Sequence, residues 1–568
     1  MRKHKGLTVF FAIGLILGIL VAYCYVLPRT PIATNGYASD SRQDRSFNVS
    51  IEINPNLELF AVVYILAFNG SDPFILAPKS YVESVLSYFG SNKNAEAVQY
   101  VKAVFSNSRP YYYRNTLIME WSNRLVQLNY LANESQGSLG FEFRLLAEFA
   151  NESNFLKFYK EHEREYRNAI QPIQESKAFK TFPELLKKLF GYSYKEYKIE
   201  YSYSLRIQGH AMTTNETAYY ISNVPQPTKV VKPRTIQAQF EEITILHEFS
   251  HPYVDRALSS LDLSNLSYYV EVLQNELPLL VIADDWHVRN IDNYMNELLT
   301  EGLAIYIAEN LNISQGIIKF RLLRDLVLLY PLPYVIREYY IFMHDNMTLP
   351  KFLPILMSKM QKIATPNNVS RYYEQEVPVT WYGALNHVVV AGKVVIVYGE
   401  GYEILALQLK SSLERTLEDA GVYVQIEVTT PDNITASQLK EDLILVGTPT
   451  DNSIIKKLDG LMPFRVASHG DGWSIIENRE VVEDLYSFNM STLLEIPSNS
   501  KILCNNGGWI VEVLRNPWEK ENFITVFAPF GSKSEDPFLQ YLGLPSSYIL
   551  YCNGEYIEGF YTQEGVVQ

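Results

Sequence analysis

The sequence predicts an α+β protein. A mostly helical domain is followed by a smaller α/β domain with a mainly parallel sheet, and one N-terminal transmembrane helix precedes both. Residues 7–27 form an uncharged apolar run. Between about residues 81 and 190, and again between 262 and 363, apolar residues recur three and four positions apart, which is the period of a helix packed on one face. After Lys393, short apolar runs alternate with helical stretches, as in a parallel sheet with crossover helices.

The N-terminus reads MRKHKG and continues into LTVFFAIGLILGILVAYCYVL. This run is long enough to cross a bilayer as a helix. The basic residues before it predict a cytoplasmic N-terminus and an extracellular bulk. We therefore expect a cytoplasmic stub over 1–6, a transmembrane signal-anchor over 7–27 and a polar linker over 28–46. A cleaved signal peptide is the alternative, but the run is long for one and no clear Ala-x-Ala site follows.

The composition agrees with a single-pass protein whose C-terminal bulk lies outside the cell. The net charge of −14, without a long basic run, argues against nucleic acid as a partner. Three cysteines are too few for a disulfide scaffold, although Cys504 and Cys552 could pair outside the cell. Asn-x-Ser/Thr sequons, the acceptors of N-glycosylation, begin at Asn48, Asn69, Asn133, Asn151, Asn215, Asn265, Asn312, Asn346, Asn368, Asn433 and Asn489.

Two domains follow the linker. The first is expected over residues 47–390, with strands in FNVSIEI and over 216–224, a helix from about Thr235, and further helical patterns over 262–282, 289–311, 315–328 and 350–363. The second is expected over 391–548, with 549–568 as a C-terminal tail. No glycine-rich phosphate-binding fingerprint opens a helix in the second domain, so nucleotide binding is not indicated.

The stretch ILHEFSHPYVD contains the candidate chemistry. Residues four apart share a helix face, so His247 and His251 can converge on one Zn²⁺ ion. Glu248 is displaced round the helix and can act as general base on a water molecule that the metal activates. The apolar neighbours of the motif make two surface histidines on a solvated helix a poor explanation. Pro252 is expected to end or kink the helix at the second histidine.

A zinc site needs a third protein ligand. The helical pattern NELLTEGLAIYIAEN places two carboxylates, Glu297 and Glu301, on one face. In one interpretation Glu297 binds the metal and Glu301 orients a histidine. In the other, Glu301 is the ligand, Gly302 permits close helix packing, and Tyr306 lies nearby.

HEFSH with the distant NELLTE resembles the gluzincins, the thermolysin-like superfamily of zinc metallopeptidases. That resemblance implies a zincin-like metallopeptidase domain, a Zn²⁺ cofactor and Glu297 as third ligand. TEGLAIY instead resembles the aminopeptidase N branch, which implies Glu301. INPNLELFAVVYILA (53–67) together with HEFSHPYVD is similar to an uncharacterised zincin-like family of secreted proteins, a domain of unknown function, and this similarity favours Glu297. It covers residues 47–390. The α/β domain lies outside it and looks like domains of archaeal surface-layer proteins.

Zincins bind peptides along an edge strand by strand addition, and TAYYISNV (217–224) is the candidate strand. A transition-state stabiliser is usually a Tyr or His. TWYGALNH offers Tyr382 and His387, and Tyr306 is a third option. The remaining candidates, His210, His287 and His344, lack a spaced partner and are assigned to the surface or the core.

The function expected from these features is that of a membrane-anchored extracellular zinc peptidase acting on a peptide or protein substrate. The alternative is a non-catalytic cell-envelope protein on a zincin fold, with an envelope partner bound by the α/β domain. The intact Glu248 speaks against that alternative, because a site without activity has no need of the base. Hydrolysis of another amide, in an envelope polymer, is a third possibility.

Overall fold

The computed structural model describes residues 47–563, except for gaps at 108–110, 135–138, 177, 226–233, 283–288, 344–346, 376, 420, 470–471, 479–480, 490–493, 497–500, 506 and 532–545. The described chain is α+β, as expected. Within these residues, no helix combines the length and the apolar character that a membrane crossing requires. The expected stub, anchor and linker of residues 1–46 lie outside the described residues, as do His287 and His344.

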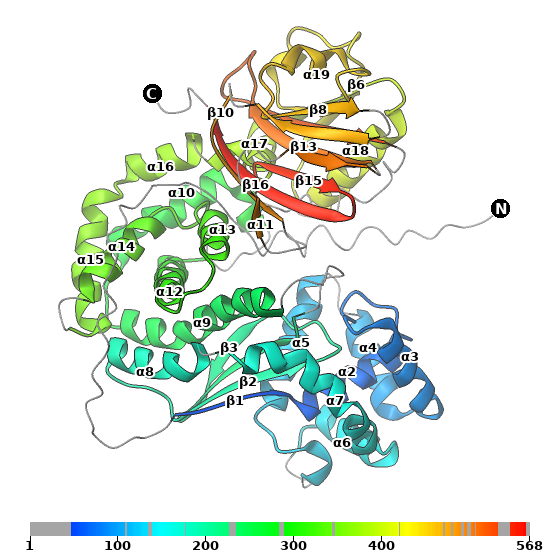
Figure 1. Cartoon of the computed structure of the whole chain (residues 1–568), viewed down its shortest axis with the longest axis vertical. Coiled ribbons are helices and arrows are strands. Elements are labelled where there is room, and N and C mark those ends of the chain that lie inside the picture. The colour runs from blue at the N-terminus through cyan, green and yellow to red at the C-terminus, as the bar shows by residue number, and fades with distance from the viewer. Residues whose placement is uncertain are drawn as a thin grey trace.

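The first domain is built on a four-stranded sheet in the order β1-β2-β4-β3 (Figure 1). The first three of these strands run parallel, and β3 pairs antiparallel with β4 at one edge. The strands are β1 (Asn48–Ile53), β2 (Glu196–Ser202), β3 (His210–Thr213) and β4 (Thr217–Asn223).

Among the described residues, seven α-helices lie between β1 and β2 in the chain. The segment 53–67 contains the first of them. This helix is buried on all sides, as its nearly uninterrupted apolar sequence requires. The Asn54 side chain caps it by accepting hydrogen bonds from the backbone N–H groups of Asn56 and Leu57. The helices are α2 (Pro55–Ala67), α3 (Lys79–Tyr88), α4 (Glu96–Asn107), α5 (Tyr111–Leu125), α6 (Phe141–Glu152), α7 (Phe155–Gln174) and α8 (Ala178–Phe190).

Helix α9 (Arg234–Leu258) contacts β3 and β4 on one side and α12 (Ile291–Asn310) on the other. In Figure 1 the remaining helices of the first domain lie beside and above α12. They are α10 (Tyr268–Glu276), α11 (Pro278–Ile282), α13 (Gln315–Asp325), α14 (Leu332–Phe342), α15 (Leu349–Ile363), α16 (Pro366–Gln375) and α17 (Trp381–Ala391). Of these, α15 contacts α8 and α9. Single 3₁₀ turns lie at Gly90–Asn92, Leu131–Asn133, Ser264–Leu266, Val377–Val379 and Gln438–Lys440.

The second domain has a nine-stranded sheet in the order β11-β10-β16-β15-β13-β14-β7-β5-β6. Only β6, β5, β7 and β14 run parallel, and the other neighbours pair antiparallel, so the expectation of a mainly parallel sheet is wrong. A smaller sheet has the order β12-β9-β8. The elements are β5 (Lys393–Tyr398), α18 (Glu403–Asp419), β6 (Gln425–Thr429), β7 (Leu443–Val446), α19 (Ser453–Leu458), β8 (Phe464–His469), β9 (Gly472–Glu477), β10 (Val482–Asn489), β11 (Leu494–Ile496), β12 (Ile502–Cys504), β13 (Gly508–Arg515), β14 (Phe523–Phe530), β15 (Tyr548–Cys552) and β16 (Glu555–Gln563).

The residues expected to form a C-terminal tail, 549–568, are part of this sheet as far as the structure describes them. Strands β15 and β16 form a hairpin across Asn553 and Gly554, and β16 pairs with β10 on its other side. Both turn residues have positive φ, which Asn and Gly adopt at low cost. The tail expectation is therefore wrong, because these short strands are completed only by pairing with β10 and β13.

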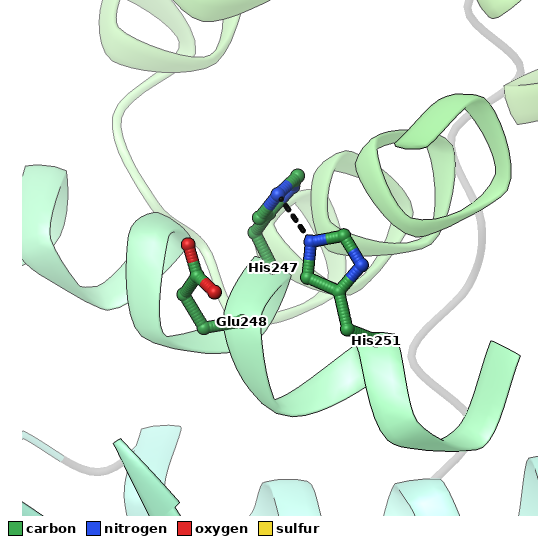
Figure 2. A group of neighbouring side chains, drawn as sticks. All are labelled: His247, Glu248 and His251. Carbon is green, nitrogen blue, oxygen red and sulfur yellow. Dashed lines mark hydrogen bonds between the residues drawn. The ribbon is translucent and has the colours of Figure 1, made fainter. Parts of the chain in front are cut away.

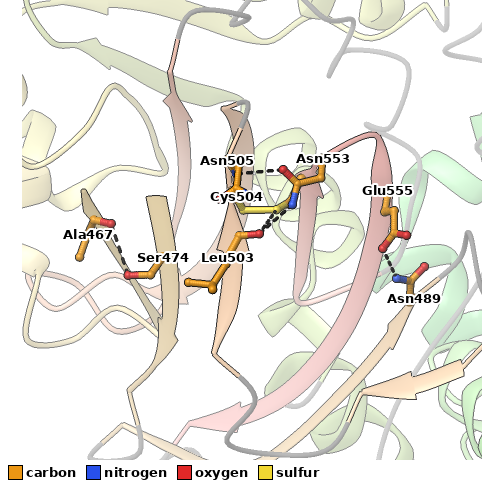
Figure 3. Close-up of a disulfide and its surroundings, with 9 residues drawn as sticks. Ala467, Ser474, Asn489, Leu503, Cys504, Asn505, Asn553 and Glu555 are labelled. Carbon is orange, nitrogen blue, oxygen red and sulfur yellow. Dashed lines mark hydrogen bonds between the residues drawn. A yellow bond between two sulfur atoms is a disulfide. The ribbon is translucent and has the colours of Figure 1, made fainter. Parts of the chain in front are cut away.

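A disulfide joins the two sheets of the second domain. Cys504 of β12 bonds to Cys552 of β15, with 5.4 Å between their Cα atoms (Figure 3). The Asn553 side chain donates to the Leu503 carbonyl and accepts from the Asn505 backbone N–H beside the bond. The pair that the sequence left open is thus formed in the structure, and such bonds persist in oxidising compartments.

Candidate metal centre

Helix α9 presents His247, Glu248 and His251 on neighbouring turns (Figure 2). The expectation that Pro252 could end the helix at His251 is wrong, because α9 continues to Leu258. Pro252 removes one helical hydrogen bond, the one that would reach the Glu248 carbonyl. Tyr253 and Val254, which follow it, are fully buried, so tertiary packing outweighs that loss.

The Nε2 atoms of the two histidines face one another 3.0 Å apart. The carboxylate of Glu297, from α12, lies beside them, with Oε2 3.4 Å from His247 Nε2 and Oε1 3.5 Å from His251 Nε2. Ligands about 2.0–2.1 Å from a tetrahedral zinc ion are roughly 3.3 Å from one another. Two imidazoles and one carboxylate at these separations therefore fit the donor set of a zinc site.

The opposite edge of each imidazole is held by an oxygen from α12. His247 Nδ1 lies 2.7 Å from Glu301 Oε2, and His251 Nδ1 lies 2.5 Å from Asn296 Oδ1. A carboxylate oxygen and an amide oxygen can only accept, so each Nδ1 carries the proton. This tautomer leaves the Nε2 lone pairs directed at the shared centre, as metal binding requires.

Glu301 and Asn296, which accept hydrogen bonds from the two histidines, are themselves fixed by further hydrogen bonds. Arg321 of α13 donates from Nε to Glu301 Oε1 at 2.7 Å and from Nη2 to Glu301 Oε2 at 2.8 Å. Its Nη1 donates to Thr244 Oγ1 of α9 at 3.0 Å. Burial raises the pKa of Glu301, but the Arg321 guanidinium and His247 overcome it and hold this pKa well below its usual range. Asn296 receives a hydrogen bond from Thr300 and donates one to Asp255.

The carboxylates of α12 favour a second proton on His247. Burial lowers the pKa of His247, but the hydrogen bonds that its ring donates to Glu297 and Glu301 outweigh it and raise the pKa to about 10. A metal ion that binds there displaces this proton, because a histidine ligand is neutral.

Glu248 lies within reach of the same centre, since one of its oxygens is within 4.8 Å of a nitrogen of each histidine. Its Oε2 also accepts a hydrogen bond of 3.2 Å from the backbone N–H of Ala211 in β3. Glu248 therefore lies between the histidine pair and the edge of the sheet. Glu297, whose oxygens lie 3.4 and 3.5 Å from the two Nε2 atoms, is the carboxylate of α12 that faces the same centre.

The predicted substrate strand is wrong. Strand β4, Thr217–Asn223, is paired with β2 on one side and β3 on the other, so its backbone is not available to a peptide. The edge strand is β3, His210–Thr213, and it contacts α9. Four residues are too few to show an alternating pattern, so the sequence signal for β3 is weak. His210, expected at the surface or in the core, is on this strand. Burial lowers the pKa of His210, and the Gln208 carbonyl and the Glu248 charge oppose this effect only in part.

The predicted transition-state stabilisers lie elsewhere. His387 Nδ1 is 2.8 Å from Asp442 Oδ2 of the second domain, and its ring packs edge-on against Phe523. Tyr382 is buried on the same helix, α17, which packs against β5, β13 and β14. Tyr306 packs between the rings of Tyr339 and Tyr340. The structure thus uses His387 in a domain contact and does not bring it to the histidine pair.

No protein-family model matches this chain, and no curated protein is significantly similar to it. The assignment of a function therefore depends on the geometry of the site.

Proposed function

We propose that this protein is a membrane-anchored extracellular zinc peptidase of the gluzincin type. The single observation behind the proposal is the convergence of His247 Nε2, His251 Nε2 and the Glu297 carboxylate, with the outer edges of both rings held from α12. A surface pair of histidines has no need of this second layer of acceptors. Glu301 is then the residue that orients His247, not a ligand.

A bound zinc ion would lower the pKa of a water molecule and polarise the peptide carbonyl. The protein's own residues do the rest. Glu248 accepts the proton of the attacking water and returns it to the leaving amine. The Ala211 N–H, which donates to Glu248 Oε2, holds this carboxylate toward β3. A peptide that adds to the edge of β3 would bring its backbone past Glu248.

The location is also a proposal. It is supported by the apolar run at 7–27, by the Cys504–Cys552 disulfide and by the sequons, most of whose asparagines are exposed. The partners that follow are a peptide or protein substrate, the membrane through the N-terminal segment and, through the α/β domain, a component of the cell envelope. No nucleic acid is expected.

The test uses the full chain purified in detergent. Zinc content is measured by elemental analysis, and cleavage of a mixed peptide library is followed by mass spectrometry, for the wild type and Glu248→Gln. We expect one zinc per chain in both, with cleavage reduced at least about 10³-fold in the variant, since general-base and orienting roles are both lost. Glu309→Gln, on α12 but bonded to Tyr340, is the matched control.

Absence of zinc from the wild type would reject the proposal. Zinc with no cleavage of any peptide would favour the non-catalytic envelope protein or the hydrolysis of another amide. Cleavage that survives Glu248→Gln would reject Glu248 as the general base.

A further inference from the structure

Helix α13 (Gln315–Asp325) connects the candidate metal centre to the second domain. In Figure 1 it lies between α12 and the strands β10 and β16. One of its residues, Arg321, bonds to the site. The residues that precede Arg321, from Gly316 to Phe320, contact the nine-stranded sheet.

The apolar part of this contact is an aromatic cluster around Phe320. Its ring stacks on Phe488 of β10 with 4.3 Å between centroids and an angle of 14°, and it lies 6.3 Å from Phe560 of β16. Its ring also lies 6.5 Å from that of Phe240 in α9, the helix that carries His247 and His251. Phe320, Phe488 and Phe560 are each at most 3% exposed, and all belong to the core of the first domain. The cluster is therefore a packed core contact between the domains.

Polar contacts fix the same helix in register. The Tyr486 hydroxyl of β10 donates to the Gly316 carbonyl at 2.7 Å. The Lys319 ammonium lies 4.5 Å from the centre of the Tyr486 ring and 3.7 Å from Glu495 of β11. A Cβ at Gly316 would lie 3.3 Å from Glu495 Cβ, so the backbones approach closely here. Few positions of α13 along β10 and β11 satisfy these contacts together.

Arg321 follows Phe320 directly and makes the contacts to the site. Two of its N–H groups go to the two oxygens of Glu301, and a third goes to Thr244. Glu301 Oε2 in turn accepts from His247 Nδ1. A contiguous set of contacts thus runs from Phe488 through Phe320, Arg321 and Glu301 to the first histidine.

We propose that the α/β domain positions the metal centre through α13, with Arg321 as the positioning residue. This inference rests on the proposed zinc function. The paired Arg–carboxylate bond tolerates little displacement, because a planar guanidinium meets both oxygens at once. If α13 shifts, Glu301 loses its partner and the His247 ring loses the acceptor that fixes its tautomer and orientation. A second domain that served only as an attachment to the cell surface would have no influence on the orientation of the His247 ring.

The experiment measures zinc affinity of the full chain by competition with a chromogenic chelator, together with the visible spectrum of the Co²⁺-substituted protein and the Tm of the metal-free protein. The variants are Phe488→Ala, Arg321→Met and Arg321→Lys. We expect Phe488→Ala and Arg321→Met to weaken zinc binding by about 10- to 100-fold and to change the Co²⁺ spectrum. Arg321→Lys restores part of the affinity, since it keeps the charge but loses the paired bond.

Two further variants keep the inference testable. Tyr551→Ala, on β15 where the ring stacks on Trp509, is the control for general loss of stability in the second domain. Tyr486→Phe removes only the hydroxyl that binds Gly316 and serves if Phe488→Ala fails to fold; we expect a few-fold loss of zinc affinity.

A wild type that binds no zinc rejects the proposed function itself. A wild type that binds zinc, with Phe488→Ala and Arg321→Met binding as tightly, overturns only the role of α13. The same conclusion follows if Tyr551→Ala weakens zinc binding as much as Phe488→Ala does.

Discussion

Glu297 and Glu301 are four residues apart on one helix, yet their surroundings differ. Glu297 lies beside both Nε2 atoms and is partly exposed, whereas Glu301 is 1% exposed and gives both oxygens to Arg321. A carboxylate whose charge is neutralised by arginine is a weak candidate for a metal ligand and a good one for holding a histidine. Glu301 differs from Glu297 because Arg321, which pairs with it, lies on α13, whereas both glutamates lie on α12.

Replacement of the two glutamates separates these roles. Glu297→Gln removes a charged ligand and should abolish stoichiometric zinc binding, whereas Glu301→Gln should weaken it by about 10- to 100-fold. Zinc affinity by chelator competition checks this, with Glu309→Gln as the control on the same helix. If Glu301→Gln loses zinc and Glu297→Gln retains it, Glu301 is the ligand and the assignment is reversed.

A second buried carboxylate makes stability depend on pH. Glu512 of β13 is fully buried, its Oε2 accepts from the Phe464 N–H at 3.0 Å, and its Oε1 has no hydrogen-bond partner among the described residues. Burial raises the pKa of Glu512 to about 8 from its ordinary 4.5, and Asp459 adds to the rise. The folded state therefore keeps a proton that the unfolded state has released between these two values.

The stabilising contribution of protonated Glu512 is thus complete below pH 4.5 and falls by about 1.4 kcal/mol per pH unit up to the folded pKa of about 8. Glu512→Gln cannot ionise, so we expect its stability relative to wild type to rise between pH 5 and pH 8. Denaturant unfolding at several pH values measures this. A difference between the two proteins that does not change with pH would show that Glu512 ionises normally when folded.

At the scale of elements, the close approach of α12 to α14 sets the position of α12. A Cβ at Gly302 would lie 2.8 Å from Val335 Cγ1 and 3.3 Å from the Tyr339 ring. These are β-branched and aromatic side chains in a packed core, which give way only at a cost. The expectation that Gly302 permits close helix packing is confirmed, whichever neighbouring glutamate binds metal.

Gly302→Ala should therefore destabilise the fold by about 1–3 kcal/mol, because overpacking outweighs the higher helix propensity of alanine. It should also weaken zinc binding, since α12 carries both glutamates. Thermal unfolding of the metal-free protein and zinc affinity are the measurements. An increase in Tm would show that α14 adjusts without cost. Gly460→Ala, where a Cβ meets no atom within 4 Å, is the control.

At the scale of the whole molecule, the sequons can be compared with the surface. Most of their asparagines are exposed: Asn48, Asn69, Asn133, Asn151, Asn215, Asn265, Asn312 and Asn433. Asn368 is half-buried and Asn346 lies outside the described residues. Asn489, in contrast, is 7% exposed in β10, and its Nδ2 donates to Glu555 at 2.7 Å (Figure 3).

In a host that glycosylates extracellular proteins, the exposed sites should be modified and Asn489 should not. A glycan on Asn489 would break a buried hydrogen bond and separate β10 from its neighbours. Peptide mapping after treatment with a peptide-N-glycosidase, which converts each modified Asn to Asp, measures the occupancy. If no exposed site carries a glycan in such a host, the proposed extracellular location loses its main support.

The sequence by itself determined the features that depend on residues near one another in the chain. His247 and His251 share a helix face because four residues make about one turn, and Glu248 follows from the same geometry. The pattern of α12 was predictable for the same reason, because its apolar residues recur with the period of a helix, and the short apolar run from Lys393 was expected as a strand and forms β5. The run that forms α2 is apolar almost throughout, so no period distinguished a buried helix from a strand there.

Only the tertiary structure decided the features that depend on distant partners. Glu297 and Glu301 are distinguished by Arg321, and the edge strand is β3 because β4 is paired on both sides. The residues expected as a tail form β15 and β16 because these strands pair with β13 and β10. His387 forms a hydrogen bond with Asp442. The physical reason is common to all four. Strand pairing and buried ion pairs are contacts between segments far apart in sequence, and no local pattern of side chains encodes which segments will meet.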